Sequence, residues 1–338
     1  MPSGDSLKWV PGWCGRMLSA AFRMVLVALF LLVCSTSSAQ SPAATHLVAE
    51  GGECLMYSMA LWGDALRARA PEFSLEVRTG GEAKAMRDLG EGTVQMAMLA
   101  RDATADELGF FRNRWGYLPT RIALAMDALV LAVHRDNPIQ AIHVEEADAI
   151  YSEDRTMGWP RDILKWGDLE GCGAKWAQRP ITRYGRTLDS SVTGLVLMYF
   201  PEQKILRMPI QLLPDGMAMA ETLAADPNGI CAANLVENFA SIKFLAMYPA
   251  GSRTAVFPTQ EAVSSGEYPY SRNLYVYVNK PPRRDMDPLL KQFLSFALSR
   301  EGQEVVKAVG QAPLGRDLRI LNLTKLSKSS VSDLLRVR

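Results

Sequence analysis

The first hundred residues alternate between short apolar segments and segments whose apolar residues recur at helical spacing. Residues 46–50, 73–79 and 94–100 have the length and apolar content of strands. Residues 54–70 and 82–92 instead place apolar residues three and four positions apart, as an amphipathic helix does. The resulting order of strand, helix, strand, helix, strand predicts a parallel sheet that helices cover.

The same two periods continue through the rest of the chain. Residues 123–135 form a long apolar run that predicts a strand, and residues 272–280 alternate cleanly between polar and apolar positions. Residues 286–310 predict an amphipathic helix that is interrupted at Gly302. Shorter patterns predict a helix at 144–152, a strand at 181–185, and a helix, a turn and a strand at 218–235. The fold class that these patterns predict is α/β.

The N-terminus has the order of a secretory signal peptide. Three basic residues precede the apolar run 24–33, and the small residues of "STSSA" follow it, ending at Ala39. The apolar run is about ten residues long, which is too short to span a bilayer comfortably. We therefore expect residues 1–39 to be removed and the mature protein to be periplasmic or secreted. Two alternatives are a retained signal anchor and a lipid attached to Cys34.

Composition and net charge say little about the fold, but they restrict the kinds of molecule that the protein binds. Of the 338 residues, 48% are hydrophobic and 22% are charged, which is typical of a globular protein. The length favours two domains over one. The formal net charge of +1 gives no electrostatic reason to expect nucleic acid as a partner.

Cysteine and histidine residues offer little chemistry. The expected mature chain keeps three cysteines, Cys54, Cys172 and Cys231. One alternative is a Cys172–Cys231 disulfide with Cys54 left over, and the other is three separate buried thiols. The three histidines are scattered and no spacing is typical of a metal site. We therefore expect no enzyme activity, no metal and no cofactor.

Glycines and hydroxyl side chains gather in three turns, each after a predicted strand and before a predicted helix. They are "EGGEC" at 50–54, "RTGGEA" at 78–83 and "GRTLDSS" at 185–191. In open α/β sheets, ligands collect at the carboxyl ends of the strands, and helix N-termini offer free N–H groups to anions. The turns therefore predict a common anion site. Arg186 is the expected strongest contact, because its planar guanidinium suits an oxyanion.

Longer segments of the chain resemble one known family. The motif "FPTQEAVSSGEYPYSRNLYVYVNK" at 257–280, followed by residues 286–314, is similar to the C-terminal part of phosphate ABC-transporter substrate-binding proteins. Residues 125–171 resemble that family's crossover strand, "NP" turn and short helix, and residues 92–108 resemble the end of its third strand. The resemblance runs from about residue 46 to residue 316, and the C-terminal motif is its most specific part.

This resemblance implies a type II periplasmic binding protein, in which two α/β domains are joined by two crossovers and hold a ligand in the cleft between them. Residues 44–128 and 252–320 would form domain I, residues 129–251 domain II, and residues 321–338 a C-terminal tail. The family also implies a small-molecule ligand, an oxyanion such as phosphate, and an ABC permease in the inner membrane as the partner.

The family's ligand-binding positions can be carried onto this chain residue by residue. The matching positions are Glu53, Cys54, Gly81, Glu82, Ala100, Arg101, Arg186, Ser190 and Ser191. Two of them, Glu53 and Glu82, are glutamates where the family offers threonine or serine. Two like charges about 4 Å apart repel by about 4 kcal/mol at an effective dielectric constant of about 20. Since micromolar affinity amounts to only about 8 kcal/mol, two such glutamates could abolish phosphate binding.

We therefore expect phosphate to bind more weakly than about 100 μM. The alternative to a transport receptor is a binding module with no part in transport. Its cleft would be filled by Glu–Arg pairs, with Arg101 or Arg186 as the counter-ion.

Overall fold

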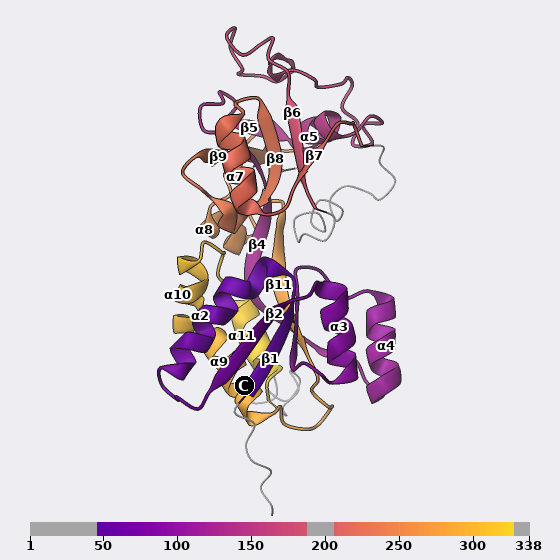
Figure 1. The fold of residues 1–338 in the computed structure, drawn as a ribbon, viewed down its shortest axis with the longest axis vertical. Coiled ribbons are helices and arrows are strands. Elements are labelled where there is room, and N and C mark those ends of the chain that lie inside the picture. The colour runs from indigo at the N-terminus through magenta and orange to yellow at the C-terminus, as the bar shows by residue number, and fades with distance from the viewer. Residues whose placement is uncertain (1–45, 188–205, 250, 328–338) are drawn as a thin grey trace, which may run out of the picture. The chain divides into compact units, whose positions relative to one another are not determined.

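The computed structural model describes residues 46–187, 206–249 and 251–327 (Figure 1). The chain divides into two units, Met1–Ala44 and Thr45–Arg338, and the described residues all belong to the second. The predicted signal peptide lies outside the described residues, as do the site residues Ser190 and Ser191. Within the described part of the chain, no helix is both long and apolar enough to cross a membrane.

The first three strands confirm the expected order of elements. β1 (His46–Gly51) lies between β2 (Ser74–Thr79) and β3 (Met96–Leu99), and both pairings are parallel. The connections contain α2 (Met56–Arg67) and α3 (Glu82–Glu91), as predicted. Helices lie on both sides of these strands (Figure 1). That cover explains why the residues of β3 are all buried.

Two long strands and a set of shorter elements complete the described chain. The long strands are β4 (Thr120–His134) and β11 (Ser271–Val278). The shorter strands are β5 (Ala141–His143), β6 (Thr182–Arg186), β7 (Gln211–Leu213), β8 (Gly229–Asn234), β9 (Ile242–Phe244) and β10 (Ala246–Tyr248). The helices are α4 (Ala105–Trp115), α5 (Val144–Tyr151), α7 (Gly216–Ala225), α8 (Gln260–Ser265), α9 (Pro288–Ala297), α10 (Arg300–Ala308) and α11 (Arg316–Thr324), with 3₁₀ turns η1 (Glu53–Leu55), η2 (Trp166–Asp168) and η3 (Leu235–Glu237).

One sheet runs through the described residues in the order β2-β1-β3-β11-β4-β8-β6-β7, with β9 also paired to β4. β4 is central to this sheet because its two ends have different partners. Residues 120–128 pair antiparallel with β11, whereas residues 129–134 pair antiparallel with β8 and β9. The sheet therefore has a parallel set of strands at each end, β2-β1-β3 and β8-β6-β7, with β11 and β4 between them.

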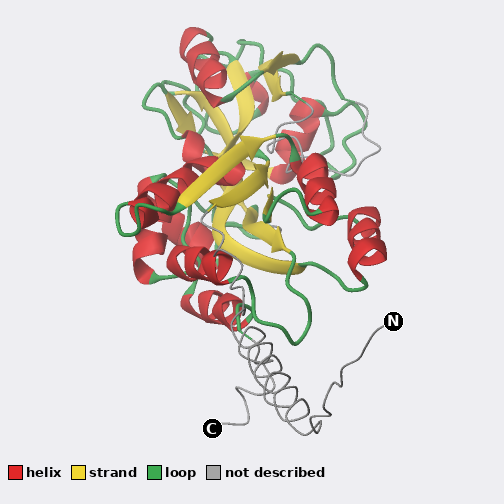
Figure 2. Cartoon of the chain, turned by 60° about the horizontal axis from the view of Figure 1, so that its bottom comes forward, coloured by secondary structure: helices red, strands yellow, loops and turns green. Residues whose placement is uncertain are grey.

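The buried side chains form two main cores that meet within β4. One surrounds β1, β3, α2, α9 and α10 and includes Ala125, and a smaller cluster under α3 and α4 lies in the same part of the chain. The other surrounds β8, α5 and α7 and includes Ala128, while Met126 packs against both. We call the elements around these cores the first lobe and the second lobe. Figure 2 shows the strands in the middle of the described chain with helices on either side.

The chain returns from the second lobe to the first just before β11. Ala262 of α8 and the following Tyr268 and Tyr270 are buried in the second core. The Tyr268 hydroxyl donates a 2.8 Å hydrogen bond to the Leu129 carbonyl oxygen, and the Leu129 N–H donates a 2.9 Å bond to the Tyr270 carbonyl oxygen. The return segment thus lies beside β4, the segment on which the chain first crossed.

Candidate anion-binding site

The turn between β2 and α3 places Glu82 at the first position of α3. Gly81 precedes it with φ of 84° and ψ of 154°, a conformation that residues with a side chain rarely adopt. The Gly81 N–H donates a 3.2 Å hydrogen bond to the Gly51 carbonyl oxygen, which holds this turn against the end of β1. Gly81 therefore serves the backbone geometry that positions Glu82.

The Glu82 carboxylate contacts groups from the turns that follow β1 and β3. Its Oε1 accepts a 2.7 Å hydrogen bond from the Ala100 N–H, and its Oε2 lies 3.0 Å from Nε of Arg101. A Cβ atom placed on Gly52 would lie 3.3 Å from Glu82 Oε1, so the carboxylate also lies against the turn after β1. A carboxylate of the chain itself thus occupies a position at the carboxyl ends of these strands, where an anion site was expected.

Arg101 is held by two glutamates at once. Its two terminal nitrogens each donate a 2.8 Å hydrogen bond to the Glu107 carboxylate, while its Nε faces Glu82. Glu107 also caps α4, since its Oε2 accepts a 2.8 Å bond from the Thr104 N–H. The hydrogen bonds to Glu107 raise the pKa of Arg101. Burial opposes ionisation of Glu107, but the hydrogen bonds from Arg101 and Thr104, together with the charge of Arg101, lower the pKa of that carboxyl.

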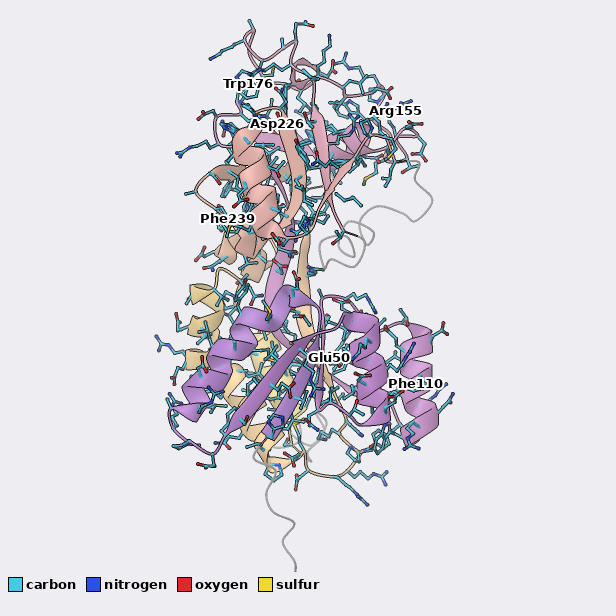
Figure 3. The ribbon with its side chains drawn as sticks, in the orientation of Figure 1. Glu50, Phe110, Arg155, Trp176, Asp226 and Phe239 are labelled. Atoms are coloured by element: carbon cyan, nitrogen blue, oxygen red, sulfur yellow. The ribbon has the colours of Figure 1, made fainter. Side chains whose placement is uncertain are left out.

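Another buried carboxylate lies beside the same turns. The Glu50 side chain in β1 is 3% exposed and pairs at 2.5 Å with Nζ of Lys84, which is also 2.6 Å from Asp88 (Figure 3). A Cβ atom on Gly80 would overlap Glu50 Oε1, so the glycine gives the carboxylate its space. Lys84 is thus shared by two carboxylates, as Arg101 is. This edge of the first lobe therefore carries an excess of negative charge, which opposes a second anion.

Glu53 and Cys54 differ from Glu82 in what surrounds them. Glu53 is exposed, and it makes no ion pair or side-chain hydrogen bond with the described residues. Cys54 is buried, and its carbonyl oxygen accepts a hydrogen bond from Nε2 of Gln311. Of the two glutamates that the sequence placed in the cleft, the structure brings only Glu82 together with Ala100 and Arg101.

Arg186 ends β6 in the second lobe, with 3% of its side chain exposed. Its Nη1 lies 2.7 Å from Oε1 of Glu237. The other oxygen of Glu237 accepts a 3.0 Å hydrogen bond from the Asn234 N–H at the start of η3. Glu237 therefore ties the expected ligand arginine to the turn that follows β8. The sequence Asn-Leu-Val-Glu has the spacing of a capping pair. It could therefore have revealed the bond between the Glu237 carboxylate and the Asn234 N–H.

A second buried arginine was missed by the sequence interpretation. Arg272 of β11 lies 3.3 Å from the Asp127 carboxylate, and the two side chains are 5% and 2% exposed. The signal was present in the chain, because Arg272 shares the buried face of β11 with Leu274 and Val276. Asp127 is likewise a lone acid in an apolar run. A buried charge of this kind requires a partner of opposite charge. The sequence therefore indicated that Asp127 and Arg272 each need such a partner.

The thiols and histidines show no catalytic arrangement among the described residues. Cys54, Cys172 and Cys231 are free and buried, which corresponds to the second of the two alternatives. Burial, with Glu82 adding to it, raises the pKa of Cys54 to about 12, and burial raises the pKa of Cys231 to about 12. Such thiols stay protonated and unreactive at neutral pH. In the described ranges, no group of three or more His, Cys, Asp or Glu could hold a metal ion.

Comparisons of the sequence with known proteins identify its relatives. The family model of the PBP superfamily domain matches residues 36–301. The phosphate-binding protein PstS of Pseudomonas aeruginosa is 33% identical over 273 residues, which cover 80% of this chain and 83% of that protein. The protein SphX of Synechococcus elongatus is 22% identical over 306 residues, covering 88% of this chain and 86% of that protein.

Solved structures agree with these relatives on the fold. A phosphate ABC transporter substrate-binding protein from Clostridium perfringens, crystallised with bound phosphate, has a TM-score of 0.64 at 19% identity and covers 80% of this chain and 100% of its own. An ABC-type phosphate transport receptor from Vibrio cholerae has a TM-score of 0.61 at 16% identity, with 78% and 98% covered. At these identities the likeness shows the fold alone, which is that of type II periplasmic binding proteins. The chain belongs to the PBP superfamily, in the family of phosphate ABC-transporter substrate-binding proteins.

Proposed function

We propose that this protein is an exported solute-binding protein that takes a small anion between its two lobes and delivers it to an ABC permease in the inner membrane. It performs no catalysis and needs no cofactor. The names of its relatives from Pseudomonas aeruginosa and Clostridium perfringens, which refer to phosphate, support this ligand class. A division into two domains is part of the proposal, with the first crossing near residue 129. Because Tyr268 and Tyr270 are buried in the second core, we place the return near residue 271 and not at residue 252.

One observation supports the anion class most directly. The first-lobe turns already bind a carboxylate, that of Glu82, through the Ala100 N–H and the Arg101 guanidinium. These are the groups that a free oxyanion would use. The same observation argues against tight phosphate binding. An incoming anion has to displace a charged hydrogen bond worth about 1.5–3 kcal/mol and then face the displaced carboxylate.

We therefore expect phosphate to bind with a dissociation constant above about 100 μM, with Glu82 and not Glu53 as the main cause. Titration calorimetry with inorganic phosphate on residues 40–338 tests this. Glu82→Ser removes the carboxylate and restores a neutral donor, so phosphate affinity should rise at least tenfold, about 1.4 kcal/mol. Glu53→Thr is the matched control and should change the affinity less than threefold, because Glu53 is exposed and unpaired among the described residues. Micromolar affinity in the wild type would show that Glu82 leaves the site when phosphate enters.

The export step has its own test. The sequence pattern of the first 40 residues predicts cleavage after Ala39. Mass spectrometry of the protein recovered from the periplasm or the medium should give a chain that begins at Gln40. An uncleaved N-terminus, or a lipid on Cys34, would instead attach the protein to the membrane and change how it meets a permease.

A second candidate function is a binding module without a transport role. The Glu82–Arg101 and Arg186–Glu237 pairs favour it, since both arginines already have carboxylate partners. A thermal-shift screen of the mature chain against phosphate, sulfate, other oxyanions, amino acids and sugars separates the two functions. A receptor is stabilised by at least one of these ligands, whereas a module whose cleft is filled by its own side chains responds to none.

A further inference from the structure

Arg272 lies where the sheet passes from the first lobe to the second. It is the second residue of β11 and lies directly opposite Asp127 of β4. One residue beyond that pair, between Ala128 and Leu129, β4 exchanges β11 for β8 as its partner. Figure 1 shows β4 and β11 running side by side through this junction. A buried ion pair therefore lies at the point where both crossing strands leave one lobe for the other.

The Arg272 guanidinium contacts both lobes. Its Nη1 donates a 3.3 Å hydrogen bond to the carbonyl oxygen of Ala100, which follows β3 in the first lobe. Its Nη2 donates to Oδ1 of Asn234 at 3.2 Å, and Asn234 ends β8 in the second lobe. The same Nη2 lies 3.3 Å from Asp127 Oδ2, while Asp127 Oδ1 accepts a 3.0 Å bond from the Leu235 N–H. Arg272 and Asp127 together thus hold one turn of each lobe.

Each of those turns leads directly to a proposed anion contact. In the first lobe, the Ala100 carbonyl that Arg272 holds belongs to the residue whose N–H binds Glu82. In the second lobe, the Asn234 N–H bonds to Glu237, and Glu237 pairs with Arg186. The sites that the sequence placed on separate turns are therefore linked through one buried guanidinium.

We propose that Arg272 is a positioning residue that fixes the Ala100 turn and the Asn234–Glu237 turn relative to each other and so sets the affinity of the anion site. This proposal rests on the proposed function for its effect on affinity, but its structural part does not. The planar fork of arginine suits the role, because its two terminal nitrogens point in fixed directions toward different acceptors. A lysine carries the charge on a single nitrogen and does not reproduce that geometry.

Hydrogen exchange followed by mass spectrometry tests the structural part without any ligand. Arg272→Met keeps an unbranched chain that replaces the aliphatic part of arginine, and it removes the charge and the donors. We expect exchange to rise at least tenfold at Ala100 and at Asn234 and Leu235, with Arg272→Lys giving a smaller rise. Arg69→Met is the matched control, because Arg69 pairs with Glu301 outside both turns, and it should leave these amides unchanged.

Affinity for inorganic phosphate tests the functional part, in the Glu82→Ser background where binding is expected to be measurable. Adding Arg272→Lys should weaken phosphate at least tenfold, and adding Arg69→Met should change it less than twofold. If Glu82→Ser binds no phosphate, the proposed function fails while the exchange result still decides the structural role. If the Met variant does not fold, Arg272→Lys and Asp127→Asn give the same two readouts.

Two results would overturn the proposal. One is a rise in exchange that is uniform over the core of both lobes, which would make Arg272 a contributor to global stability only. The other is unchanged phosphate affinity in the folded Arg272→Lys variant. A local rise at both turns together with weakened phosphate binding supports the positioning role.

Discussion

The two arginine sites of this protein balance their charges differently. In the first lobe, Arg101 pairs with both Glu82 and Glu107, and 30% of its side chain is exposed. In the second lobe, Arg186 pairs with Glu237 and its side chain is 3% exposed. The first site therefore has an excess of acid close to water, and the second is a buried pair. Burial makes the second pair the more costly to break, while the excess acid makes the first site the less favourable to an added anion.

Removing each arginine should separate the stabilities of the two sites most clearly. Arg186→Ala leaves Glu237 buried without that cation and should lower the free energy of unfolding by about 3–5 kcal/mol. Arg101 is itself 30% exposed, so its removal opens Glu82 and Glu107 to water and should cost about 1–2 kcal/mol. Urea unfolding of both variants at neutral pH measures the difference. Glu237→Gln added to Arg186→Ala should recover part of the loss, and equal losses at the two sites would contradict the contrast.

Replacing each arginine by lysine should distinguish the two sites by their effect on phosphate affinity. Arg186→Lys keeps a cation for Glu237 but loses the fork that suits an oxyanion, so phosphate affinity should fall at least tenfold, about 1.4 kcal/mol. Arg101→Lys should weaken it less, by about threefold, because in this background both terminal nitrogens of Arg101 stay on Glu107 and only its Nε faces the position that Glu82 vacates. Calorimetry in the Glu82→Ser background gives both values. A large effect at Arg101 would show that this arginine turns to the ligand when Glu82 is absent.

Local patterns in the sequence predicted many elements of the fold, but the predicted break at Gly302 is wrong: α9 and α10 are separated at residues 298–299, and Gly302 lies inside α10. The alternation in 73–79 and 272–280 and the helical spacing in 54–70 correspond to β2, β11 and α2. These signals are local, because side chains repeat every two residues in a strand and about every 3.6 in a helix. The glycines at 80–81 marked the turn before α3 for an equally local reason, the positive φ of Gly81.

The partners of the charged site residues were less predictable. Two glutamates were treated alike from the sequence, yet Glu82 reaches the Ala100 N–H while Glu53 is exposed on η1. Glu237 lies 51 positions after Arg186, and Arg272 lies 145 positions after Asp127. A single sequence shows that a buried charge needs a partner, but the partner is chosen by tertiary folding. The capping spacing at Glu237 was the one local signal available.

The smallest expected difference between the lobes concerns pH. Burial opposes ionisation of Glu107, yet hydrogen bonds from Arg101 and Thr104 together hold its pKa below 4.5, whereas burial raises the pKa of Glu146 in α5 above 4.5. A lowered carboxyl pKa contributes stability that is present above the unfolded value and is lost as pH falls. A raised one contributes stability that is present below the unfolded value and is lost as pH rises. The two carboxyls should therefore have opposite effects on the free energy of unfolding.

Urea unfolding between about pH 3 and pH 7 on Glu107→Gln and Glu146→Gln measures this difference. Glu107→Gln should be less stable than the wild type at neutral pH and approach it below about pH 4.5, because the lost ion pair with Arg101 matters only when the carboxyl is charged. Glu146→Gln should match or exceed the wild type at neutral pH. The amide oxygen can still accept the 2.8 Å bond from the His143 N–H, and the cost of a buried charge is removed. A neutral-pH loss in Glu146→Gln as large as that in Glu107→Gln would show that both carboxylates are stabilised by partners, and the contrast between the lobes would then rest on the arginine pairs alone.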